Sequence, residues 1–173
     1  NIMSNTKSIC EYLKIKKSDR HITTLPMNYT YGLSCINTFL FSGASILLNN
    51  YSIFERDFWN IVKKFRPNSI SGVPYTYEIL YRIGLEKLKS TSFKIFTQAG
   101  GKLDMKILEA FSEFCSNNGG LFYVMYGQTE ATARMSYLPP NMLSTKKGSI
   151  GIPIPGGHFE VKKEIISSEL FED

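Results

Sequence analysis

Short apolar runs alternate with helix-like runs along most of this chain, and this alternation restricts the possible folds more than any other feature. Strands are predicted over residues 21–25, 45–48, 68–73, 93–98 and 121–125. Helices are predicted between them, over residues 9–15, 33–41, 53–65 and 75–83 and in a segment that begins after Asp104. This order is typical of βαβ units. We therefore predict an α/β fold, a mostly parallel β-sheet flanked by helices.

Two of these helices have clear apolar stripes. Over 53–65 the apolar residues recur at the helical period, at Phe54, Phe58, Ile61, Val62 and Phe65. Pro67 ends this helix, because proline disfavours helical geometry in the residue before it. Asp104 is predicted to cap the later helix. Its stripe consists of Ile107, Leu108, Phe111, Phe114 and Cys115.

Composition excludes several classes of protein. The chain has 173 residues, 43% of them hydrophobic and 13% aromatic, which suits one folded domain or large subdomain and not a disordered chain. No apolar run approaches the roughly 18 residues of a membrane span. The formal net charge is +5, but the basic residues are spread out, so no nucleic-acid partner is predicted. Cys10, Cys35 and Cys115 lack the paired spacing of a zinc site, and three cysteines are an odd number for a disulfide framework. We therefore predict a reducing, cytoplasmic location.

The character of the sequence changes after residue 135. Residues 139–157 contain four prolines and four glycines and are typical of loops and short edge strands. We predict that residues of about 20–135 form the α/β core and that about 136–173 form a loop and edge-strand segment.

Ligands of an open parallel sheet bind outside the carboxyl ends of its strands. This rule selects four loops, at residues 26–32, 72–74, 98–102 and 126–130. If the strands are parallel, all four loops meet at one edge of the sheet. We expect the functional site there.

The last of these loops carries the most chemistry. Tyr126 offers a flat face for stacking on a heterocycle, and Gly127 allows a sharp turn of the backbone. Thr129 supplies a hydroxyl for a phosphate oxygen, and Glu130 supplies a carboxylate for Mg²⁺. The same residues also suit an ordinary polar turn that caps a helix. The paired glycines of residues 99–101 also allow two interpretations, because they suit either a flat ligand against the backbone or a tight turn.

Six segments in order resemble one family. They are LPMNYTYGLS from Leu25, FSGASILL from Phe41, SGVPYTYEIL from Ser71, TQAGGKL from Thr97, YGQTEATARMSYLPP from Tyr126 and GSIGIPIPG from Gly148. They resemble the middle of the adenylate-forming, AMP-binding superfamily, which includes acyl-CoA synthetases, luciferases and the adenylation domains of peptide synthetases. Residues of about 19–157 take part, and bacterial acyl-CoA synthetases or acyl-AMP ligases are the most similar type.

The resemblance implies a ligase that uses Mg²⁺ and ATP. Such enzymes convert a carboxylic acid into an acyl-adenylate and pass the acyl group to a thiol, either coenzyme A or a carrier protein. It implies that Tyr126 stacks on the adenine, that Val124 offers its backbone to the adenine amino group, that Thr129 binds the AMP phosphate and that Glu130 binds Mg²⁺. Thr129 and Glu130 are thus the candidate catalytic residues. The implied nucleotide-binding set is Gly100, Gly101, Lys102, Val124, Tyr126, Gly127, Gln128 and Thr129.

The resemblance also implies a pocket for the acid. Its predicted lining is Asn28, Tyr29, Gly72, Val73, Pro74 and Tyr77. Tyr29 stands where many acyl-CoA ligases carry a histidine. No aspartate lies between Thr24 and Phe54, which argues against amino-acid substrates. Tyr31 and Tyr75 suit either the pocket wall or core packing, and His21 is predicted to be structural.

Several family elements have no counterpart in the sequence. The Ser/Thr/Gly-rich phosphate loop is not matched in residues 1–19, the ribose-binding aspartate is not matched in Ser168–Asp173, and the lysine of the small C-terminal domain is missing. We expect a partial AMP-binding domain over 1–173 that is inactive alone in ATP–pyrophosphate exchange. The alternative is a non-catalytic nucleotide-binding or protein-interaction module on the same scaffold. No Gly-x-Gly-x-x-Gly pattern supports a generic dinucleotide binder. The acid and the oligomeric state are left open.

Overall fold

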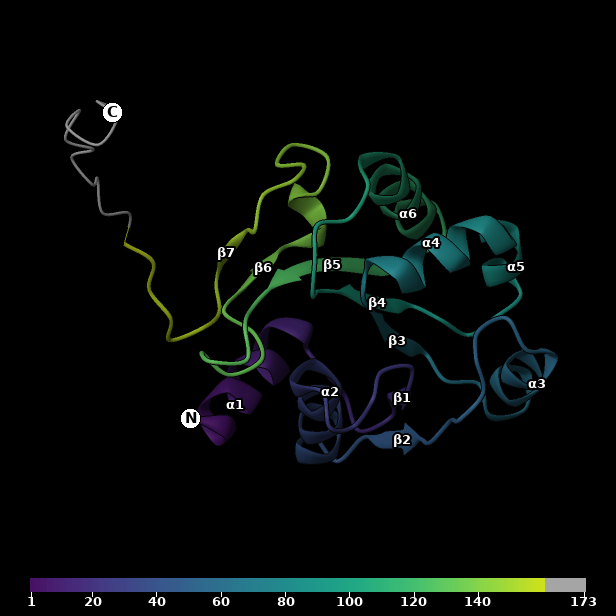
Figure 1. The fold of residues 1–173 in the computed structure, drawn as a ribbon, viewed down its shortest axis with the longest axis horizontal. Helices are drawn as coiled ribbons and strands as arrows, with labels where there is room; N and C mark the ends of the chain where they lie inside the picture. The colour runs from purple at the N-terminus through teal and green to yellow at the C-terminus, as the bar shows by residue number, and fades with distance from the viewer. Residues whose placement is uncertain (161–173) are drawn as a thin grey trace, which may run out of the picture.

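The computed structural model describes residues 1–160, and its centre is a seven-stranded sheet in the order β2-β1-β3-β4-β5-β6-β7 (Figure 1). The strands are β1 (Arg20–Ile22), β2 (Ser45–Leu47), β3 (Ser69–Gly72), β4 (Ile95–Gln98), β5 (Leu121–Tyr126), β6 (Ser136–Leu138) and β7 (Ile152–Pro153). Strands β1 to β5 pair in parallel, whereas β6 and β7 are antiparallel to their neighbours. The predicted fold class, a mostly parallel α/β sheet, is confirmed.

Helices cover both faces of the sheet (Figure 1). One face is covered by α3 (Arg56–Phe65), α4 (Pro74–Ile83), α5 (Leu85–Lys89) and α6 (Met105–Asn117). The other face is covered by α1 (Ile2–Leu13) and α2 (Thr30–Phe41), which pack against each other. A short 3-10 helix, η1 (Pro140–Met142), follows β6.

The two faces of the sheet differ in chemistry. Under α3 to α6 the strands carry apolar side chains that lie side by side in register, namely Ile22, Ile70, Phe96 and Phe122. Under α1 and α2 they carry hydroxyl groups in register, from Ser71, Thr97 and Tyr123. Buried parallel strands are usually apolar on both faces. The polar face therefore calls for a functional explanation.

Helix α3 begins later than its apolar pattern predicts. It starts at Arg56, because the preceding turn is held by the Ser52 amide, which donates to Glu55 Oε1 at 2.6 Å. Phe54 lies in this turn and is 59% exposed, whereas Phe58 is fully buried as predicted. The buried stripe of α3 is therefore shorter than the sequence pattern.

Two further helical segments differ from the prediction. Helix α1 begins at Ile2 and not near residue 9, and its buried face includes the polar residues Asn5, Thr6 and Ser8. These polar residues conceal the helical pattern in the sequence. The five-residue helix α5 after Gly84 was not predicted at all.

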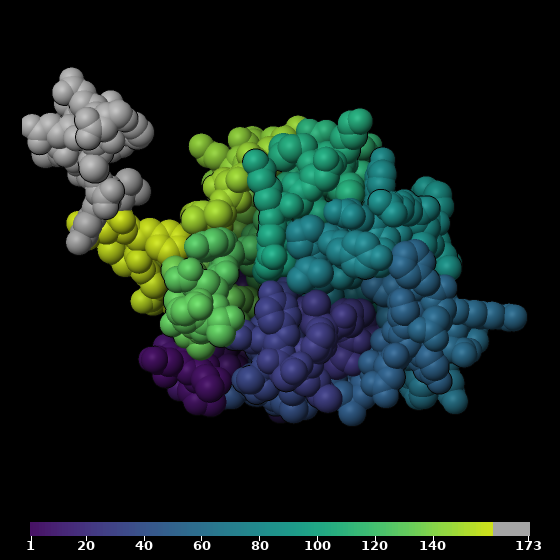
Figure 2. All heavy atoms as spheres, in the orientation of Figure 1, coloured from purple at the N-terminus to yellow at the C-terminus, as the bar shows by residue number. Residues whose placement is uncertain are grey.

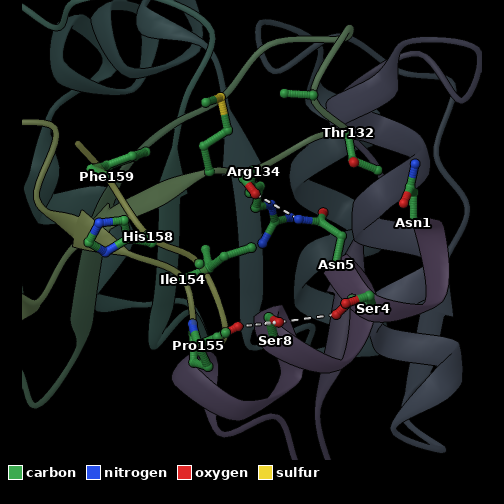
Figure 3. A pocket seen from close by; sticks show the side chains of 14 residues that line it. Asn1, Ser4, Asn5, Ser8, Thr132, Arg134, Ile154, Pro155, His158 and Phe159 are labelled. Atoms are coloured by element: carbon green, nitrogen blue, oxygen red, sulfur yellow. Dashed lines mark hydrogen bonds between the residues drawn. The ribbon is translucent and has the colours of Figure 1, made fainter. Parts of the chain in front are cut away.

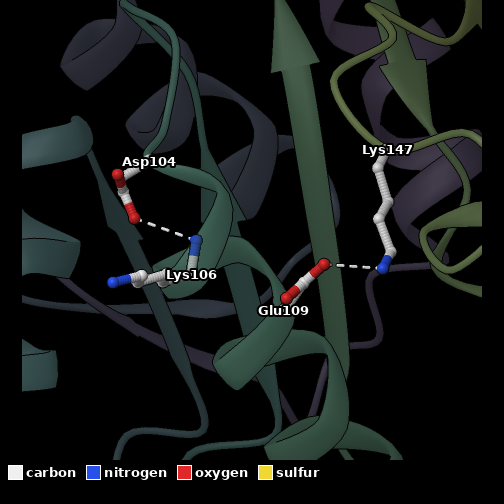
Figure 4. A network of polar contacts seen from close by, with 4 residues as sticks. All are labelled: Asp104, Lys106, Glu109 and Lys147. Atoms are coloured by element: carbon white, nitrogen blue, oxygen red, sulfur yellow. Dashed lines mark hydrogen bonds and ion pairs between the residues drawn. The ribbon is translucent and has the colours of Figure 1, made fainter.

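Helix α6 matches its prediction. The Asp104 carboxylate accepts hydrogen bonds from the amides of Lys106 at 2.9 Å and Ile107 at 3.4 Å, which is N-cap geometry (Figure 4). The predicted stripe is buried, at Ile107, Leu108, Phe111, Phe114 and Cys115. On the exposed side, Lys147 Nζ lies 2.6 Å from Glu109 Oε1. This ion pair connects the loop before β7 to α6.

Residues 139–157 form loops together with η1 and β7, as predicted. Residues 161–173, and with them the segment Ser168–Asp173 that was compared with the ribose-binding element, lie outside the described residues. The division of the chain near residue 135 stays a prediction, and β6 and β7 extend the same sheet beyond it. Within residues 1–160, no helix is long and apolar enough to span a bilayer.

Candidate functional site

The four predicted loops follow β1, β3, β4 and β5, which are neighbours in the sheet, so the loops lie along one edge (Figure 1). Contacts join them. A Cβ atom added to Gly100 would lie 2.9 Å from the Tyr29 hydroxyl oxygen and 3.1 Å from Val73 Cγ1. The Thr30 hydroxyl donates to the Thr129 hydroxyl at 3.1 Å. Segments that are remote in sequence therefore form one surface.

The glycine pair after β4 leaves its backbone open. Gly100 has a φ of +85°, a conformation that favours glycine, and both Gly100 and Gly101 are exposed. The Gly101 carbonyl accepts a hydrogen bond from Gln98 Nε2 at 2.8 Å. Gly101 also lies against Pro74, whose Cγ would be 3.1 Å from an added Cβ. This arrangement holds a flat, side-chain-free wall beside the end of β5.

Gly127 is required for a reason other than the sharp turn that the sequence suggests. Its φ is not positive, but an added Cβ would lie 2.1 Å from the carbonyl oxygen of Ala133. The two ends of the loop thus pack backbone against backbone. The Met135 amide donates to the Tyr126 carbonyl at 2.8 Å and closes the same loop, while the Tyr126 residue is 40% exposed.

The tip of this loop is open to solvent, since Gln128, Thr129 and Glu130 are all exposed. Thr129 and Glu130 line a groove of about 310 Å³ between the loop, α1 and α2. Figure 2 shows the green loop segment lying against both the purple N-terminal helix and the violet α2. One carboxylate suits Mg²⁺, which takes one or two carboxylates and completes its shell with phosphate and water. In the part of the chain that the structure describes, no cluster of three His, Cys, Asp or Glu residues could hold a metal by itself.

Three residues singled out from the sequence take no part in the contacts described above. Tyr77 is fully buried on the opposite face, where its ring packs against Phe111 and its hydroxyl donates to the Thr97 carbonyl at 2.8 Å. Tyr75 is 60% exposed on α4. Val124 lies within the sheet, in register with strands on both of its sides, so its backbone faces neighbouring strands and not the loops.

The remaining predicted residues lie at the expected edge. Asn28 and Lys102 are exposed in the loops after β1 and β4. Gly72 is buried at the end of β3, where an added Cβ would lie 2.5 Å from Thr76 Cγ2. Tyr31 lies directly below Tyr29, with the two rings edge to face and their centroids 6.4 Å apart.

A buried polar network beneath the loops was missed by sequence reasoning. The Tyr31 and Thr97 hydroxyl oxygens are 2.8 Å apart, and the Thr97 and Ser71 hydroxyl oxygens are 2.7 Å apart. Burial raises the pKa of the Tyr31 phenol, which therefore stays protonated. The network ends at Arg134, a cation that is 1% exposed. Only the hydroxyl residues at alternate strand positions could have indicated it.

His21 is structural, as predicted. Its ring stacks on Phe39 with centroids 4.7 Å apart, and its Nδ1 lies 3.1 Å from the Ser69 hydroxyl. Burial, followed by the positive charge of Arg134, lowers the pKa of His21 to about 3. The imidazole is thus neutral at physiological pH.

Comparison with known proteins decides the family. The family model described as AMP-binding enzyme matches residues 1–165 of this chain. The chain belongs to the AMP-binding enzyme family. The six sequence motifs and the loops that carry them are thereby explained together.

Two curated relatives share 27% and 29% sequence identity with this chain. A 2-succinylbenzoate–CoA ligase of Bacillus cereus is 27% identical over 154 residues, which is 88% of this chain and 30% of that protein. A marinolic acid–CoA ligase of Pseudoalteromonas sp. is 29% identical over 150 residues, which is 82% of this chain and 22% of that protein. The chain thus spans about 30% or less of the length of these relatives.

Solved structures share the fold. The o-succinylbenzoate CoA synthetase of Bacillus subtilis in complex with its acyl-adenylate intermediate superposes with a TM-score of 0.74 at 24% identity, covering 88% of this chain and 30% of that one. The same synthetase in complex with ATP and magnesium ion gives a TM-score of 0.73 at 24% identity, covering 88% of this chain and 31% of that one.

Proposed function

We propose that this chain supplies the adenine wall and the acid-binding loops of an AMP-forming acid–thiol ligase. The complete reaction would join a carboxylic acid to AMP with release of pyrophosphate and then transfer the acyl group to a thiol. Family membership supports this proposal, as do relatives named as CoA ligases and a fold neighbour solved with an acyl-adenylate. The observation that carries it is the contact of the four loops at one sheet edge around Gly100 and Thr129.

The proposed nucleotide site lies between the ends of β4 and β5. The adenine would stack on Tyr126, with Gly100, Gly101 and Lys102 as the opposite wall. Gly100 and Gly101 are exposed and carry no side chain, and Tyr126 is partly open to solvent. Both features suit a flat heterocycle. The position of Val124 inside the sheet gives less support to its predicted contact with the adenine amino group.

The proposed roles of Thr129 and Glu130 follow from the chemistry of adenylation. A carboxylate oxygen attacks the α-phosphorus in line with the leaving pyrophosphate, so alignment and charge neutralisation are the main requirements. Thr129 would donate to the α-phosphate, and its hydroxyl is held near α2 by Thr30. Glu130 would hold Mg²⁺, which supplies positive charge to the phosphates when bound.

The acid would enter beside Tyr29, between the loops after β1 and β3. Asn28, Tyr29, Val73 and Pro74 lie at this edge, whereas Tyr77 lies on the far face of the sheet. Coenzyme A or a carrier-protein thiol is the proposed acceptor. The predictions of a cytoplasmic location and of no nucleic-acid partner stay predictions.

The half-site is tested by calorimetry with AMP in the presence of Mg²⁺. Thr129→Ala should weaken AMP binding about 10-fold or more, because a hydrogen bond to a charged group is worth about 1.5–3 kcal/mol. Glu130→Gln should remove the effect of Mg²⁺ on AMP affinity. Thr145→Ala is the matched control, since Thr145 is exposed and remote from the loops. Equal affinity in all variants would contradict the assignment and favour the non-catalytic module.

A further inference from the structure

Arg134 is a buried cation without a counter-ion among residues 1–160. Its side chain lies between α1 and α2, beneath the loop that joins β5 to β6, and the residue is 1% exposed. Nη2 lies 3.2 Å from Cys35 Sγ, Nη1 lies 3.5 Å from the Tyr12 hydroxyl, and the guanidinium stands 5.1 Å from the centroid of the Tyr31 ring. Its Nε is buried with no hydrogen-bond partner. These are weak partners for a full positive charge.

Such a charge is costly without an anion. Arginine stays protonated in proteins, and a buried charge is normally paired or bound to a ligand. Within residues 1–160 the ion pairs are Lys89–Glu86 and Lys147–Glu109, both on the surface, and no carboxylate contacts Arg134. The surroundings thus offer Arg134 no charge to balance its own.

The neighbourhood of Arg134 has more donors than acceptors. The Tyr12 hydroxyl, which is buried, donates to the sulfur of Met125 at 3.0 Å, a weak acceptor. The Tyr31 hydroxyl is already engaged with Thr97. A bound anion would therefore accept from both Arg134 and Tyr12.

Space for a ligand lies next to the guanidinium. A cavity of about 300 Å³ between α1 and the segment after β7 is lined by Arg134, Asn5, Ser8, Thr132 and Pro155 among others (Figure 3). It shares Asn5 and Thr132 with the groove that contains Thr129 and Glu130. The anion site and the proposed phosphate site are thus on opposite sides of one short loop.

That loop carries backbone strain. Thr132 has a φ of +68°, a left-handed conformation that is unusual for a β-branched residue. Strained residues of this kind cluster at active sites, ligand clamps and switch regions. A shift of residues 131–133 would widen the access from the cavity to Arg134, which is 1% exposed.

We propose that Arg134, assisted by Tyr12, binds a carboxylate that the acid substrate carries at the end remote from the carboxyl group that is activated. A guanidinium can donate two parallel hydrogen bonds to the two oxygens of a carboxylate, and such charge-assisted pairs are strong. The enzyme would then select dicarboxylic acids over monocarboxylic acids of equal length. This inference rests on the proposed function for its choice of ligand. There the phosphate is assigned to Thr129 at the tip of the loop, which leaves the acid substrate to supply the anion for Arg134.

The test compares suberate with its monomethyl ester, which differ by one negative charge at one end. Calorimetry on the full 173-residue chain, in the presence of AMP and Mg²⁺, should show suberate bound about 10-fold or more tightly than the ester. Arg134→Gln should remove this preference, and Tyr12→Phe should reduce it. Arg82→Gln, which changes an exposed arginine on α4, should keep it.

Stability separates a ligand-binding role from a structural one. Replacement of buried charged groups by apolar side chains of similar volume is often neutral or stabilising, because the cost of burying the charge is removed. Arg134→Met should therefore unfold in urea at the midpoint of the wild type or above it, and should lose the preference for suberate. A lower midpoint in Arg134→Met, with the preference retained in Arg134→Gln, would make the arginine structural and overturn the proposal.

Two further measurements, competition by inorganic phosphate and the binding of AMP, show which part of the argument is wrong if a prediction is not met. Inorganic phosphate that competes with suberate in the wild type, but not in Arg134→Gln, would make this a phosphate site and overturn the carboxylate assignment. AMP binding without a preference for suberate would overturn this inference alone. A preference for suberate without any AMP binding would contradict the proposed function and leave the anion site in place.

Discussion

Replacing Gly127 by alanine would test whether the loop after β5 depends on close backbone packing. The added Cβ would lie 2.1 Å from the Ala133 carbonyl oxygen, 2.8 Å from its carbon and 2.9 Å from the Cα of Arg134. Non-bonded heavy atoms prefer separations of about 3.5 Å, so the two segments would have to separate by more than about 1 Å. Both partners are backbone, and neither can rotate away as a side chain could.

The free energy of unfolding should fall by about 3 kcal/mol, the upper part of the range for overpacked sites. Backbone strain adds nothing to this value, because Gly127 does not have a positive φ. Gly120 provides the matched control, since it lies just before β5 as Gly127 lies just after it, and also lacks a positive φ. A Cβ there would meet its nearest atom, the Lys94 carbonyl oxygen, at 3.3 Å. Gly120→Ala should therefore stay within about 1 kcal/mol of the wild type.

Urea unfolding followed by circular dichroism measures both variants. Hydrogen exchange then shows which backbone amides lose protection. The Met135 amide, which donates to the Tyr126 carbonyl, should lose protection in Gly127→Ala. AMP binding should be lost with it, because the loop positions Thr129. Equal stability of the two variants, with the Met135 amide still protected, would refute the reasoning that close packing and not the turn requires this glycine.

Three shorter predictions follow from the described residues. Burial lowers the pKa of His21 from 6.5 to about 3, so the contribution of the neutral imidazole to stability is complete above pH 6.5 and is lost as the pH falls toward 3. The free energy of unfolding should therefore drop by about 2 kcal/mol between pH 7.5 and pH 5. The drop should be much smaller in His21→Gln. Thr132→Gly should raise the free energy of unfolding by about 1 kcal/mol in urea titrations, because glycine adopts the left-handed conformation of residue 132 without the strain of a β-branched side chain. A loss of stability would mean that the contacts of the threonine side chain outweigh this strain. Burial raises the pKa of Cys115 to about 12, so iodoacetamide at pH 8 should label the partly exposed Cys10 first in peptide mapping, and equal labelling would contradict the burial.

Local patterns were enough to predict most elements of the fold. Helix α6 combines a capping aspartate, an apolar stripe and a glycine after its end, and these features agree with one another. Helix α3 shows the limit of this reasoning. Phe54 fits the helical period, but the hydrogen bond between Ser52 and Glu55 holds a turn there and leaves the ring in solvent. Periodicity alone does not report such a side-chain bond.

The loops of the candidate site were predictable because parallel strands bring their carboxyl ends to one edge. The environment of Arg134 was not, because its partners come from α1 and α2 and lie 122 residues away at Tyr12 and 99 residues away at Cys35. No local pattern connects residues so far apart. The placement of Tyr77 in the core under α4 was not predictable either, since the face of the sheet that a side chain packs against depends on the whole packing arrangement.

The strands nevertheless contain the information that separates the two faces. In register across the sheet, Ile70 lies beside Phe96, whereas one residue later Ser71 lies beside Thr97. A sheet stabilised only by burial would place apolar side chains in both rows, because hydroxyls in a core cost free energy unless they are hydrogen-bonded. Here the hydroxyl row lies under α1 and α2, on the face that carries Tyr31 and Arg134. Polar residues at alternate positions of buried parallel strands thus predict which face carries the buried polar network, before any loop is considered.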